Sequence, residues 1–258
     1  MKRIAPPEEI KLAGFNNLTK SLSFNLYDFC VARNESERES YIAYISNRFN
    51  AKKVTNVLTG ICDIIEAQVL AVSDQNYEPW GASSMVLMSD TKGSGLSNPG
   101  FHGTSMHVDK SHICAHTYPD FHGGGTICSF RIDIDISTCG EISPLNALNF
   151  MFEKFDADVV VIDYAVRGFT RDLAGKRVYM DHQVKSIQDY IDPKVLSDYY
   201  CVDLALQSDN IWQTKMLRIH QNTPSYFRDP VDPEDPAIRH YMEAINREMR
   251  GVLHMWPD

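Results

Sequence analysis

The sequence predicts an α+β fold: a two-layer sandwich in which helices cover one face of a mainly antiparallel sheet, plus a C-terminal extension. Strand-like runs show apolar residues alternating with polar ones, and helical runs show apolar residues three and four positions apart. These runs follow one another as strand, helix, strands and then strands, helix, strand, an order typical of an α+β sandwich. We expect one domain over residues 1–190 and an extension over residues 191–258.

The first predicted strand and helix are adjacent in the chain. The strand lies within residues 19–32, where apolar and polar residues alternate from Leu22 to Leu26. Asn34 is placed to cap a helix, and Glu37 three residues later completes a capping box. The two signals together predict that the helix begins directly after the strand.

A second helix and two further strands are predicted next. Apolar residues at helical spacing form the helix, and they are Val54, Val57, Leu58, Ile61, Ile64 and Ile65. Residues 69–72 and 82–88 are predicted strands on either side of a turn that contains proline and glycine. Residues 90–105 are rich in Gly, Ser and Asn, so we expect an exposed loop there.

The clearest strand is predicted over residues 126–137, because apolar and polar residues alternate throughout it. Its predicted core face consists of Phe130, Ile132, Ile134 and Ile136. Ser143 is expected to cap a helix whose first turn contains Pro144. Residues 159–162 are a predicted buried strand, and a last helix is expected near residues 236–250.

The composition predicts a cytoplasmic globular protein. The chain has 258 residues, of which 43% are hydrophobic and 23% charged, enough for a sizeable core. No apolar run reaches the roughly 20 residues of a membrane span, and the N-terminus lacks the apolar segment of a signal peptide. We therefore expect no membrane partner. A formal net charge of −9 argues against nucleic acid and would favour cationic ligands.

The cysteines predict reduced thiols. The chain has six cysteines, which are dispersed and form no Cys-x-x-Cys pair: Cys30, Cys62, Cys114, Cys128, Cys139 and Cys201. Disulfides are rare in cytosolic proteins, so most of these residues are expected to behave as small buried hydrophobic side chains.

Histidines are concentrated in the segment 107–122, which contains four of the nine in the chain. Zinc would need three or four nitrogen or sulfur ligands that converge on one tetrahedron. The spacing of His112 and His116 suits two ligands on a helix, whereas β-branched neighbours and Pro119 favour a strand or loop. Structural zinc is therefore a minor interpretation of this segment.

Two other interpretations of the segment remain open. Ser111 or Cys114 beside a histidine could act as a nucleophile. No Gly-x-Ser-x-Gly elbow surrounds Ser111, which argues against an ordinary hydrolase. Alternatively, the polar residues are solvated or hydrogen-bonded residues of a strand without a chemical role.

Five segments, in chain order, resemble motifs of the pyruvoyl-dependent S-adenosylmethionine decarboxylases, in particular their longer bacterial branch. Asp109-Lys-Ser-His-Ile-Cys-Ala-His-Thr-Tyr-Pro119 looks like the processing segment of that family, and Ile136-Ser-Thr-Cys-Gly140 looks like its catalytic cysteine turn. The other similar segments are Gly14-Phe-Asn-Asn-Leu-Thr-Lys-Ser-Leu-Ser-Phe24, Tyr77-Glu-Pro-Trp-Gly-Ala-Ser83 and Val166-Arg-Gly-Phe-Thr-Arg-Asp172. The resemblance extends from about residue 12 to residue 220, so it covers most of the chain.

The resemblance implies that the chain cleaves itself between Lys110 and Ser111, giving fragments 1–110 and 111–258. The Ser111 hydroxyl would attack the Lys110 carbonyl and convert the amide to an ester. Elimination would then leave a dehydroalanine that hydrolyses to a pyruvoyl group. Only serine, or less readily threonine or cysteine, offers both the nucleophile and the leaving group that this sequence of steps needs.

The same resemblance assigns roles around the pyruvoyl group. His116 matches the processing base of the family, and Ser83 matches a serine that assists maturation. The pyruvoyl ketone would form a Schiff base with the substrate amine and act as the electron sink. Cys139 matches the proton donor, and a thiol with a pKa of about 8.5 is largely protonated at neutral pH.

Three residues are implied to bind the substrate. Tyr77 and Tyr118 match two aromatic residues that sandwich the adenine, where flat rings suit stacking and the nearby sulfonium charge. Asp120 stands where many relatives carry a glutamate that holds the ribose hydroxyls. Aspartate is one methylene shorter, so this position departs from the family pattern.

The implied activity is that of a carboxy-lyase: decarboxylation of S-adenosylmethionine to the aminopropyl donor of spermidine biosynthesis. One alternative is a pyruvoyl decarboxylase of the same fold that acts on ornithine or arginine, which would not need the adenine-stacking pair. Another is an inactive regulatory paralogue, against which the joint presence of Ser111, His116 and Cys139 argues.

The resemblance also implies an assembly and an activator. A sheet with one polar face usually needs a second copy to cover it, so we expect a homo-oligomer, a dimer or tetramer of cleaved two-chain units. Magnesium is an activator in the long bacterial branch. Its ligands cannot be assigned from sequence, although Asp133, Asp135 and Asp163 are candidates by charge.

One geometric difficulty follows from strand periodicity. Ser111 and His116 are five residues apart, so in a continuous strand their side chains point to opposite faces. Both reach the same carbonyl only if the backbone bends near residues 111–114, or once cleavage frees the end at residue 111.

Overall fold

Strands dominate the described part of the protein. The computed structural model describes residues 17–90, 110–121, 125–139, 142–171, 174–179 and 184–254, so most of the loop predicted at 90–105 lies outside the described residues. The strands are β1 (Thr19–Val31), β2 (Ala67–Asn76), β3 (Ala82–Asp90), β4 (Lys110–Asp120), β5 (Ile127–Cys139), β6 (Val159–Arg167), β7 (Thr170–Arg171), β8 (Arg177–Val178), β9 (Tyr199–Leu206) and β10 (Ile211–Arg218). The helices are α1 (Glu35–Arg48), α2 (Ala51–Ile64), α4 (Leu148–Lys154), α5 (Pro193–Leu196) and α6 (Pro236–His254).

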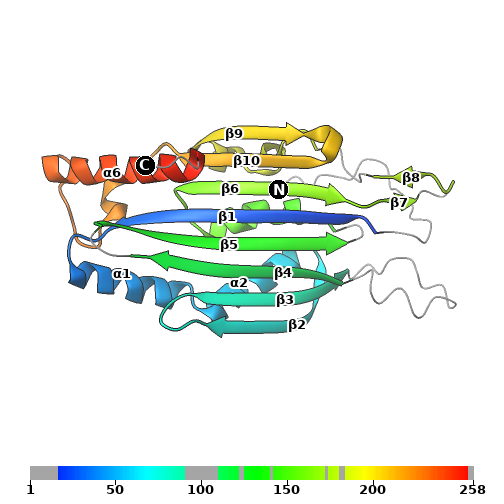
Figure 1. Ribbon diagram of the computed structural model, residues 1–258, viewed down its shortest axis with the longest axis horizontal. Coiled ribbons are helices and arrows are strands. Elements are labelled where there is room, and N and C mark those ends of the chain that lie inside the picture. The colour runs from blue at the N-terminus through cyan, green and yellow to red at the C-terminus, as the bar shows by residue number, and fades with distance from the viewer. Residues whose placement is uncertain are drawn as a thin grey trace.

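Eight of these strands form one antiparallel sheet in the order β2-β3-β4-β5-β1-β6-β10-β9, and β7 pairs with β8 in a two-stranded sheet (Figure 1). The first strand of the chain therefore lies near the middle of the sheet, between β5 and β6. The predicted α+β class with a mainly antiparallel sheet is confirmed.

Alternation along the strands separates a core face from an open face. On β1, Leu22, Phe24 and Leu26 are at most 2% exposed. On β5 the predicted apolar residues are likewise buried, and they are Phe130, Ile132, Ile134 and Ile136. The side chains between them lie on the opposite face, which is called the open face below. Strand periodicity in the sequence therefore gave the correct face for both central strands.

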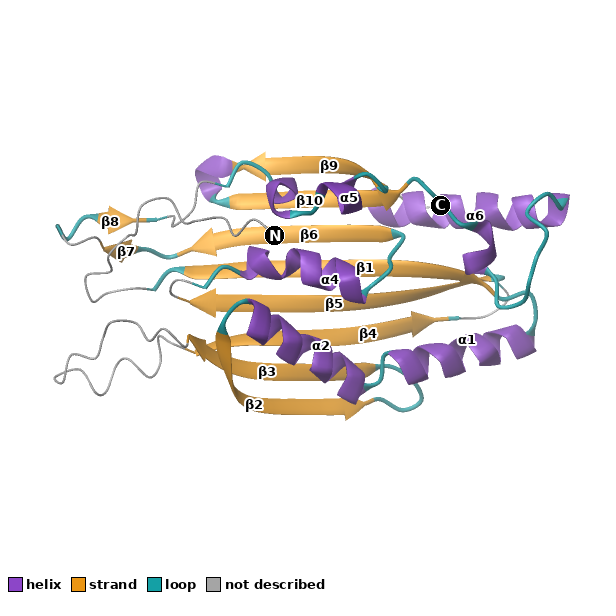
Figure 2. Ribbon diagram, turned by 180° about the vertical axis from the view of Figure 1, so that it is seen from behind, coloured by secondary structure: helices purple, strands orange, loops and turns teal. Residues whose placement is uncertain are grey.

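Helices α1, α2, α4 and α5 cover the core face (Figure 2). Asn34 caps α1 as predicted, because its side chain accepts a hydrogen bond from the Glu37 backbone N–H at 3.0 Å. The Glu37 carboxylate reaches back to the Arg33 backbone N–H at 2.7 Å, one residue earlier than a standard capping box. Helix α2 begins after a second capping residue, Asn50.

Helix α6 departs from the predicted one-sided arrangement. It packs on the open face at one end of the sheet, where Ile238, Ile245 and Met249 lie against Phe29 and Val31 of β1. Phe29 and Val31 occupy positions that alternate with the core residues of β1, so they point away from α2 and α4. A small second core therefore exists on the open face, and the rest of that face is left uncovered by helices of the described chain.

Two other expectations need adjustment. Ser143 precedes a 3-10 helix, Pro144–Ala147, and its side chain makes no capping hydrogen bond. The Ser143 carbonyl instead accepts the Asn146 N–H at 3.3 Å, the shorter bond that a 3-10 turn uses. The segment 191–258, predicted as an extension, contributes β9, β10 and α6, and β10 pairs with β6 in the main sheet.

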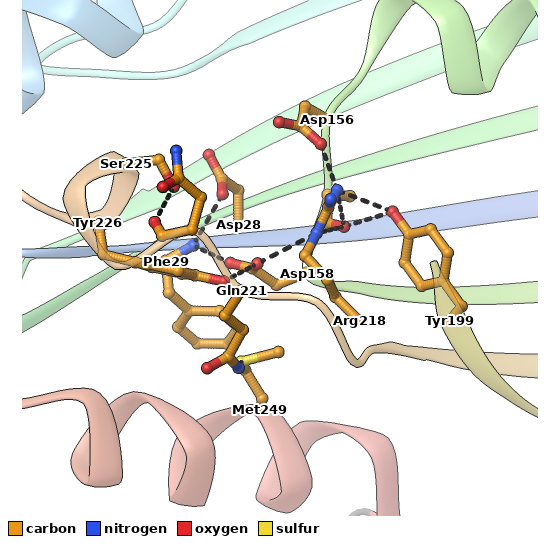
Figure 3. A network of polar contacts seen from close by, with 12 residues as sticks. Asp28, Phe29, Asp156, Asp158, Tyr199, Arg218, Gln221, Ser225, Tyr226 and Met249 are labelled. Atoms are coloured by element: carbon orange, nitrogen blue, oxygen red, sulfur yellow. Dashed lines mark hydrogen bonds and ion pairs between the residues drawn. The ribbon is translucent and has the colours of Figure 1, made fainter. Parts of the chain in front are cut away.

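A buried polar network ties this later segment to the centre of the sheet (Figure 3). The Asp158 carboxylate accepts hydrogen bonds from the Phe29 backbone N–H at 3.1 Å and from the Tyr226 hydroxyl at 2.6 Å. Arg218 of β10 lies 3.6 Å from Asp158 and also forms an ion pair with Asp156. The carboxyl groups of Asp28 and Asp158 are neighbours, because the Phe29 N–H lies 3.1 Å from an oxygen of each.

The two carboxyl groups of this network differ in what supports their charge. Burial, followed by the charges of Asp158 and Asp156, raises the pKa of Asp28 well above its usual value. Burial also raises the pKa of Asp158, but Tyr226 and Arg218 oppose that shift. The contacts of Asp158 with Tyr226 and Arg218 favour its charged form, so we expect Asp28 to be the carboxyl group that holds a proton.

Asp28→Asn is expected to flatten the pH dependence of folding stability. The folded state holds a proton that the unfolded chain releases above about pH 4, so the free energy of unfolding falls as pH rises toward the folded pKa. Asparagine needs no such proton and can still donate a hydrogen bond to Asp158. The decrease in the free energy of unfolding between pH 5 and pH 8 should therefore be smaller in the variant. Urea unfolding at both pH values measures this.

Asp158→Asn is the matched control, with the opposite expected result. It removes the charge that Arg218 and Tyr226 face, so it should destabilise the protein by about 2–4 kcal/mol at both pH values. Equal destabilisation by the two variants would contradict the assignment of the proton to Asp28.

Candidate functional site

The predicted site residues are distributed over β3, β4 and β5, which are neighbours in the sheet. On the open face, Ser83 of β3 lies directly opposite His116 of β4. His116 in turn lies opposite Asp133 of β5. The register of three strands therefore places a hydroxyl, an imidazole and a carboxylate in one row across the open face.

Tyr77 joins this row from the turn that follows β2. Its hydroxyl lies 3.4 Å from His116 Nδ1, with the donor set by the histidine tautomer. Its backbone N–H bonds to the Gly81 carbonyl at 2.9 Å, which closes the turn between β2 and β3. Gly81 has a φ of +100°, and a Cβ there would lie 2.9 Å from the Thr117 carbonyl oxygen, so glycine is required on both grounds.

Tyr118 lies two residues beyond His116 on the same face, and the two rings are 6.4 Å apart. Its side chain is about half exposed. The guanidinium of Arg131, directly opposite on β5, lies 5.5 Å from the Tyr118 ring centre. Tyr77, His116 and Tyr118, all predicted from sequence, therefore gather on the open face, whereas the motif resemblance assigns no role to Arg131.

Ser111 and Cys139 meet at the other end of β4. Ser111 is 2% exposed, and its Oγ accepts a hydrogen bond from the Cys139 backbone N–H at 3.0 Å. Cys139 is the last residue of β5, and its side chain is partly buried. The pairing of β4 with β5 thus brings together two residues that the sequence separates by most of β4, a turn and the rest of β5.

Ser111 and His116 point to opposite faces, as the residue count implied. Ser111 shares the core face with the buried Ile113 and Ala115, and no register shift interrupts the pairing of β4 with either neighbour. No bend therefore brings the two side chains together in the uncleaved chain. At about 3.3 Å per residue, Ser111 also lies about 23 Å along the strand from Tyr118.

The remaining predicted residues are at the ends of β4. Lys110 begins the strand opposite Ser89, and its side chain lies outside the described set. Asp120 ends the strand opposite Ser129 and is exposed. Asp120 is thus two residues beyond Tyr118, on the same side of the strand.

The metal candidates do not converge. Asp133 is engaged by Arg131, whose Nε and Nη2 each lie 2.6 Å from one of its carboxylate oxygens. Asp163 accepts a hydrogen bond from Gln213 Nε2 at 2.7 Å. Asp135 and Asp163 lie on opposite sides of Ser23 of β1. Within the described ranges, no group of three His, Cys, Asp or Glu side chains is arranged to hold a metal ion, zinc included.

Two of the sequence motifs have a structural explanation. The backbone N–H of Asn17 bonds to the Phe169 carbonyl at 3.1 Å, and the Phe169 N–H bonds to Asn17 Oδ1 at 2.8 Å. Gly168 has a φ of +81°, and a Cβ there would lie 2.3 Å from the Asn17 carbonyl oxygen. The segments that contain Asn17 and Gly168 therefore connect the start of β1 to the end of β6.

The cysteines and the helices can be compared with the predictions of reduced thiols and of no membrane span. All six cysteines have free thiols. In the part of the chain that the structure covers, no helix combines the length and the apolar character needed to cross a membrane.

Comparison with known proteins identifies related sequences. Residues 47–168 match the family model described as S-adenosylmethionine decarboxylase. An S-adenosylmethionine decarboxylase proenzyme of Photorhabdus laumondii is 50% identical over 255 residues, covering 95% of this chain and 97% of the relative. One from Clostridium perfringens is 45% identical over 256 residues, covering 94% of each. A crystal structure of the Aquifex aeolicus adenosylmethionine decarboxylase matches with a TM-score of 0.33 and 14% identity, covering 65% of this chain and 98% of that one.

Proposed function

The chain belongs to the S-adenosylmethionine decarboxylase family, and from this premise we propose that it removes the carboxylate of S-adenosylmethionine as carbon dioxide. The product is the decarboxylated aminopropyl donor for spermidine biosynthesis, and the enzyme is a carboxy-lyase. The observation that carries this conclusion is 50% identity to a proenzyme of that name along 95% of the chain.

The proposed maturation cleaves the bond between Lys110 and Ser111. Attack of Ser111 Oγ on the Lys110 carbonyl carbon forms an ester and releases the Ser111 nitrogen as an amine. Loss of the Cα proton then expels the Lys110 carboxylate, and hydrolysis of the dehydroalanine yields ammonia and the pyruvoyl group. The hydrogen bond from the Cys139 N–H supports this proposal, because it fixes the Ser111 hydroxyl while leaving a lone pair for attack.

His116 and Ser83 stay the proposed processing residues, with one structural requirement. Because Ser111 is on the core face, the first residues of β4 must leave the sheet, or His116 must come from another copy, before the imidazole can reach the Ser111 Cα proton. The contact of His116 with Tyr77 and its position opposite Ser83 support a shared site for the three side chains.

The pyruvoyl group, once formed, supplies the electron sink for loss of carbon dioxide. Cys139 is the proposed donor of the proton that replaces the carboxylate at the substrate α-carbon. Tyr77 and Tyr118 are proposed to stack on the adenine, with Asp120 binding the ribose hydroxyls. The exposed position of Tyr118 and its closeness to His116 support these assignments.

A homo-oligomer is proposed on geometric grounds. The substrate-stacking residues and Ser111 lie about 23 Å apart along β4, farther than one S-adenosylmethionine molecule extends, and on opposite faces. A second unit packed antiparallel on the open face would bring its own Tyr118 over the end of the sheet where Ser111 lies, and residue 111 would reach that face once cleavage frees the start of β4. This arrangement also covers the polar face, as a dimer or as half of a tetramer.

Magnesium and location remain predictions. The open face carries Asp135 and Asp163, but the described carboxylates form no ligand set. The cytoplasm stays the predicted location.

Release of carbon dioxide from carboxyl-labelled substrates tests the function. We expect release from S-adenosylmethionine and at least about 100-fold less from ornithine or arginine, because neither presents an adenine to Tyr77 and Tyr118. Preference for ornithine or arginine would favour the alternative decarboxylase. An uncleaved chain without release from any of the three would favour the inactive paralogue.

A further inference from the structure

A row of side chains crosses the open face beside the proposed adenine site. Arg131 of β5 is directly opposite Tyr27 of β1 on one side and Tyr118 of β4 on the other. Its guanidinium carbon lies 5.6 Å from the Tyr27 ring centre and 5.5 Å from the Tyr118 ring centre. Both contacts are within the range of cation–π attraction.

Asp133 holds the guanidinium of Arg131 in this position. Two parallel hydrogen bonds of 2.6 Å join Arg131 Nε and Nη2 to the two carboxylate oxygens. Such a bidentate pair fixes the plane of the guanidinium as well as its distance. The Asp133 side chain is 14% exposed, so solvent screens this ion pair less than one on the surface.

The Tyr118 ring needs a neighbouring side chain to fix its orientation. The residue is 48% exposed, so its own strand holds the ring weakly. Arg131 of β5 is on one side of Tyr118, whereas Tyr77 lies on the β3 side, where its N–H bonds to Gly81 and its hydroxyl reaches His116. Between the two tyrosines the chain has Gly81, which adds no side chain. Arg131 therefore occupies one side of the Tyr118 ring, and the proposed purine would take the side toward Tyr77.

The charges suit a cationic substrate. A lone arginine beside a sulfonium ion would repel it, whereas Arg131 paired with Asp133 is close to neutral. Asp133 also lies opposite His116, so the same carboxylate faces the row that contains the proposed processing base.

We propose that Arg131, held by Asp133 and supported by Tyr27, is a positioning residue that orients the Tyr118 ring for stacking on a purine. The inference rests on the proposed function, since it assumes that Tyr118 stacks on the adenine. Arg131 acts through Tyr118 and does not contact the reacting atoms. It thereby contributes to the preference for a nucleoside-bearing amino acid over a small one.

The test measures binding of 5′-methylthioadenosine to the cleaved enzyme by calorimetry. This probe carries the adenine but no amino group, so it reports stacking without chemistry at the pyruvoyl end. Arg131→Lys keeps the charge but loses the planar fork, and it should weaken binding about tenfold. KM for S-adenosylmethionine should rise similarly, while kcat changes less than about twofold and cleavage at Ser111 is unaffected.

A matched control is available elsewhere in the chain. Arg228 lies 4.6 Å from the ring centre of Tyr44, which belongs to α1 on the covered side of the sheet. Arg228→Lys removes the same kind of contact and should leave binding of the probe unchanged. Tyr27→Leu keeps Arg131 and Asp133 but removes the aromatic ring on the other side of Arg131. It should also weaken binding of the probe.

The outcomes separate this proposal from the function it rests on. Unchanged probe affinity in Arg131→Lys and Tyr27→Leu, with a large loss in Tyr118→Ala, would overturn the role of Arg131 and keep adenine stacking. Unchanged affinity in Tyr118→Ala as well would overturn both. Equal losses of unfolding free energy in Arg131→Lys and Arg228→Lys, with a loss of binding only in the former, would support the positioning role.

Discussion

Replacing Ser111 with alanine is expected to leave the chain in one piece and to abolish decarboxylation. Alanine has no hydroxyl to attack the Lys110 carbonyl, so neither the ester nor the pyruvoyl group can form. The effect should be the largest of any single substitution, because both cleavage and the electron sink depend on one oxygen atom. Intact mass spectrometry should show one species of 29.3 kDa instead of fragments 1–110 and 111–258.

Controls for this experiment come from the same sheet. Ser129 of β5 lies opposite Asp120, at the end of β4 that is far from Ser111, so Ser129→Ala should be cleaved at the normal rate. His116→Ala should still be cleaved, but about 100-fold or more slowly, if the imidazole assists elimination. Two fragments and full turnover from Ser111→Ala would disprove the maturation proposed here.

Cys139→Ala is expected to separate maturation from turnover. The contact between Cys139 and Ser111 uses the backbone N–H, at 3.0 Å, and the substitution leaves that group in place. Cleavage should therefore continue. The thiol that we propose as proton donor is lost, and kcat should fall about 100- to 10,000-fold, the usual contribution of a general acid.

The matched control is Cys114→Ala. Cys114 is a partly buried thiol opposite Asp135 on β5, and burial, with a smaller contribution from Asp135, raises its pKa. We assign it no role, so its replacement should leave kcat within about twofold. Mass spectrometry and carbon dioxide release on the same preparations report cleavage and turnover. If Cys139→Ala blocked cleavage, or if it kept full turnover, the assigned role would be wrong.

The elements of the fold were largely predictable because their signals are local. Alternation on β1 and β5 identified both the strands and their buried faces, since successive side chains of a strand point to opposite sides. The Asn34 cap was predicted for the same reason, because the capping atom and the N–H it accepts are three residues apart.

The candidate site was predictable only in part. The motif resemblance named Ser111, Cys139, Tyr77 and Tyr118, and the residue count correctly placed Ser111 and His116 on opposite faces. Arg131 could not be given a role, because its contacts with Tyr27 and Tyr118 arise from two strand pairings that no local pattern encodes. The bond from Cys139 to Ser111 depends on the same kind of pairing.

The sequence by itself determined most of the strands and helices before residue 168, the last helix, and which side of the central strands β1 and β5 is buried. Only the tertiary structure decided which strands are neighbours, that β9 and β10 extend the sheet, and that α6 packs on the open face. Local periodicity is a property of a few consecutive residues, whereas strand order and register are set by backbone hydrogen bonds and burial between distant segments.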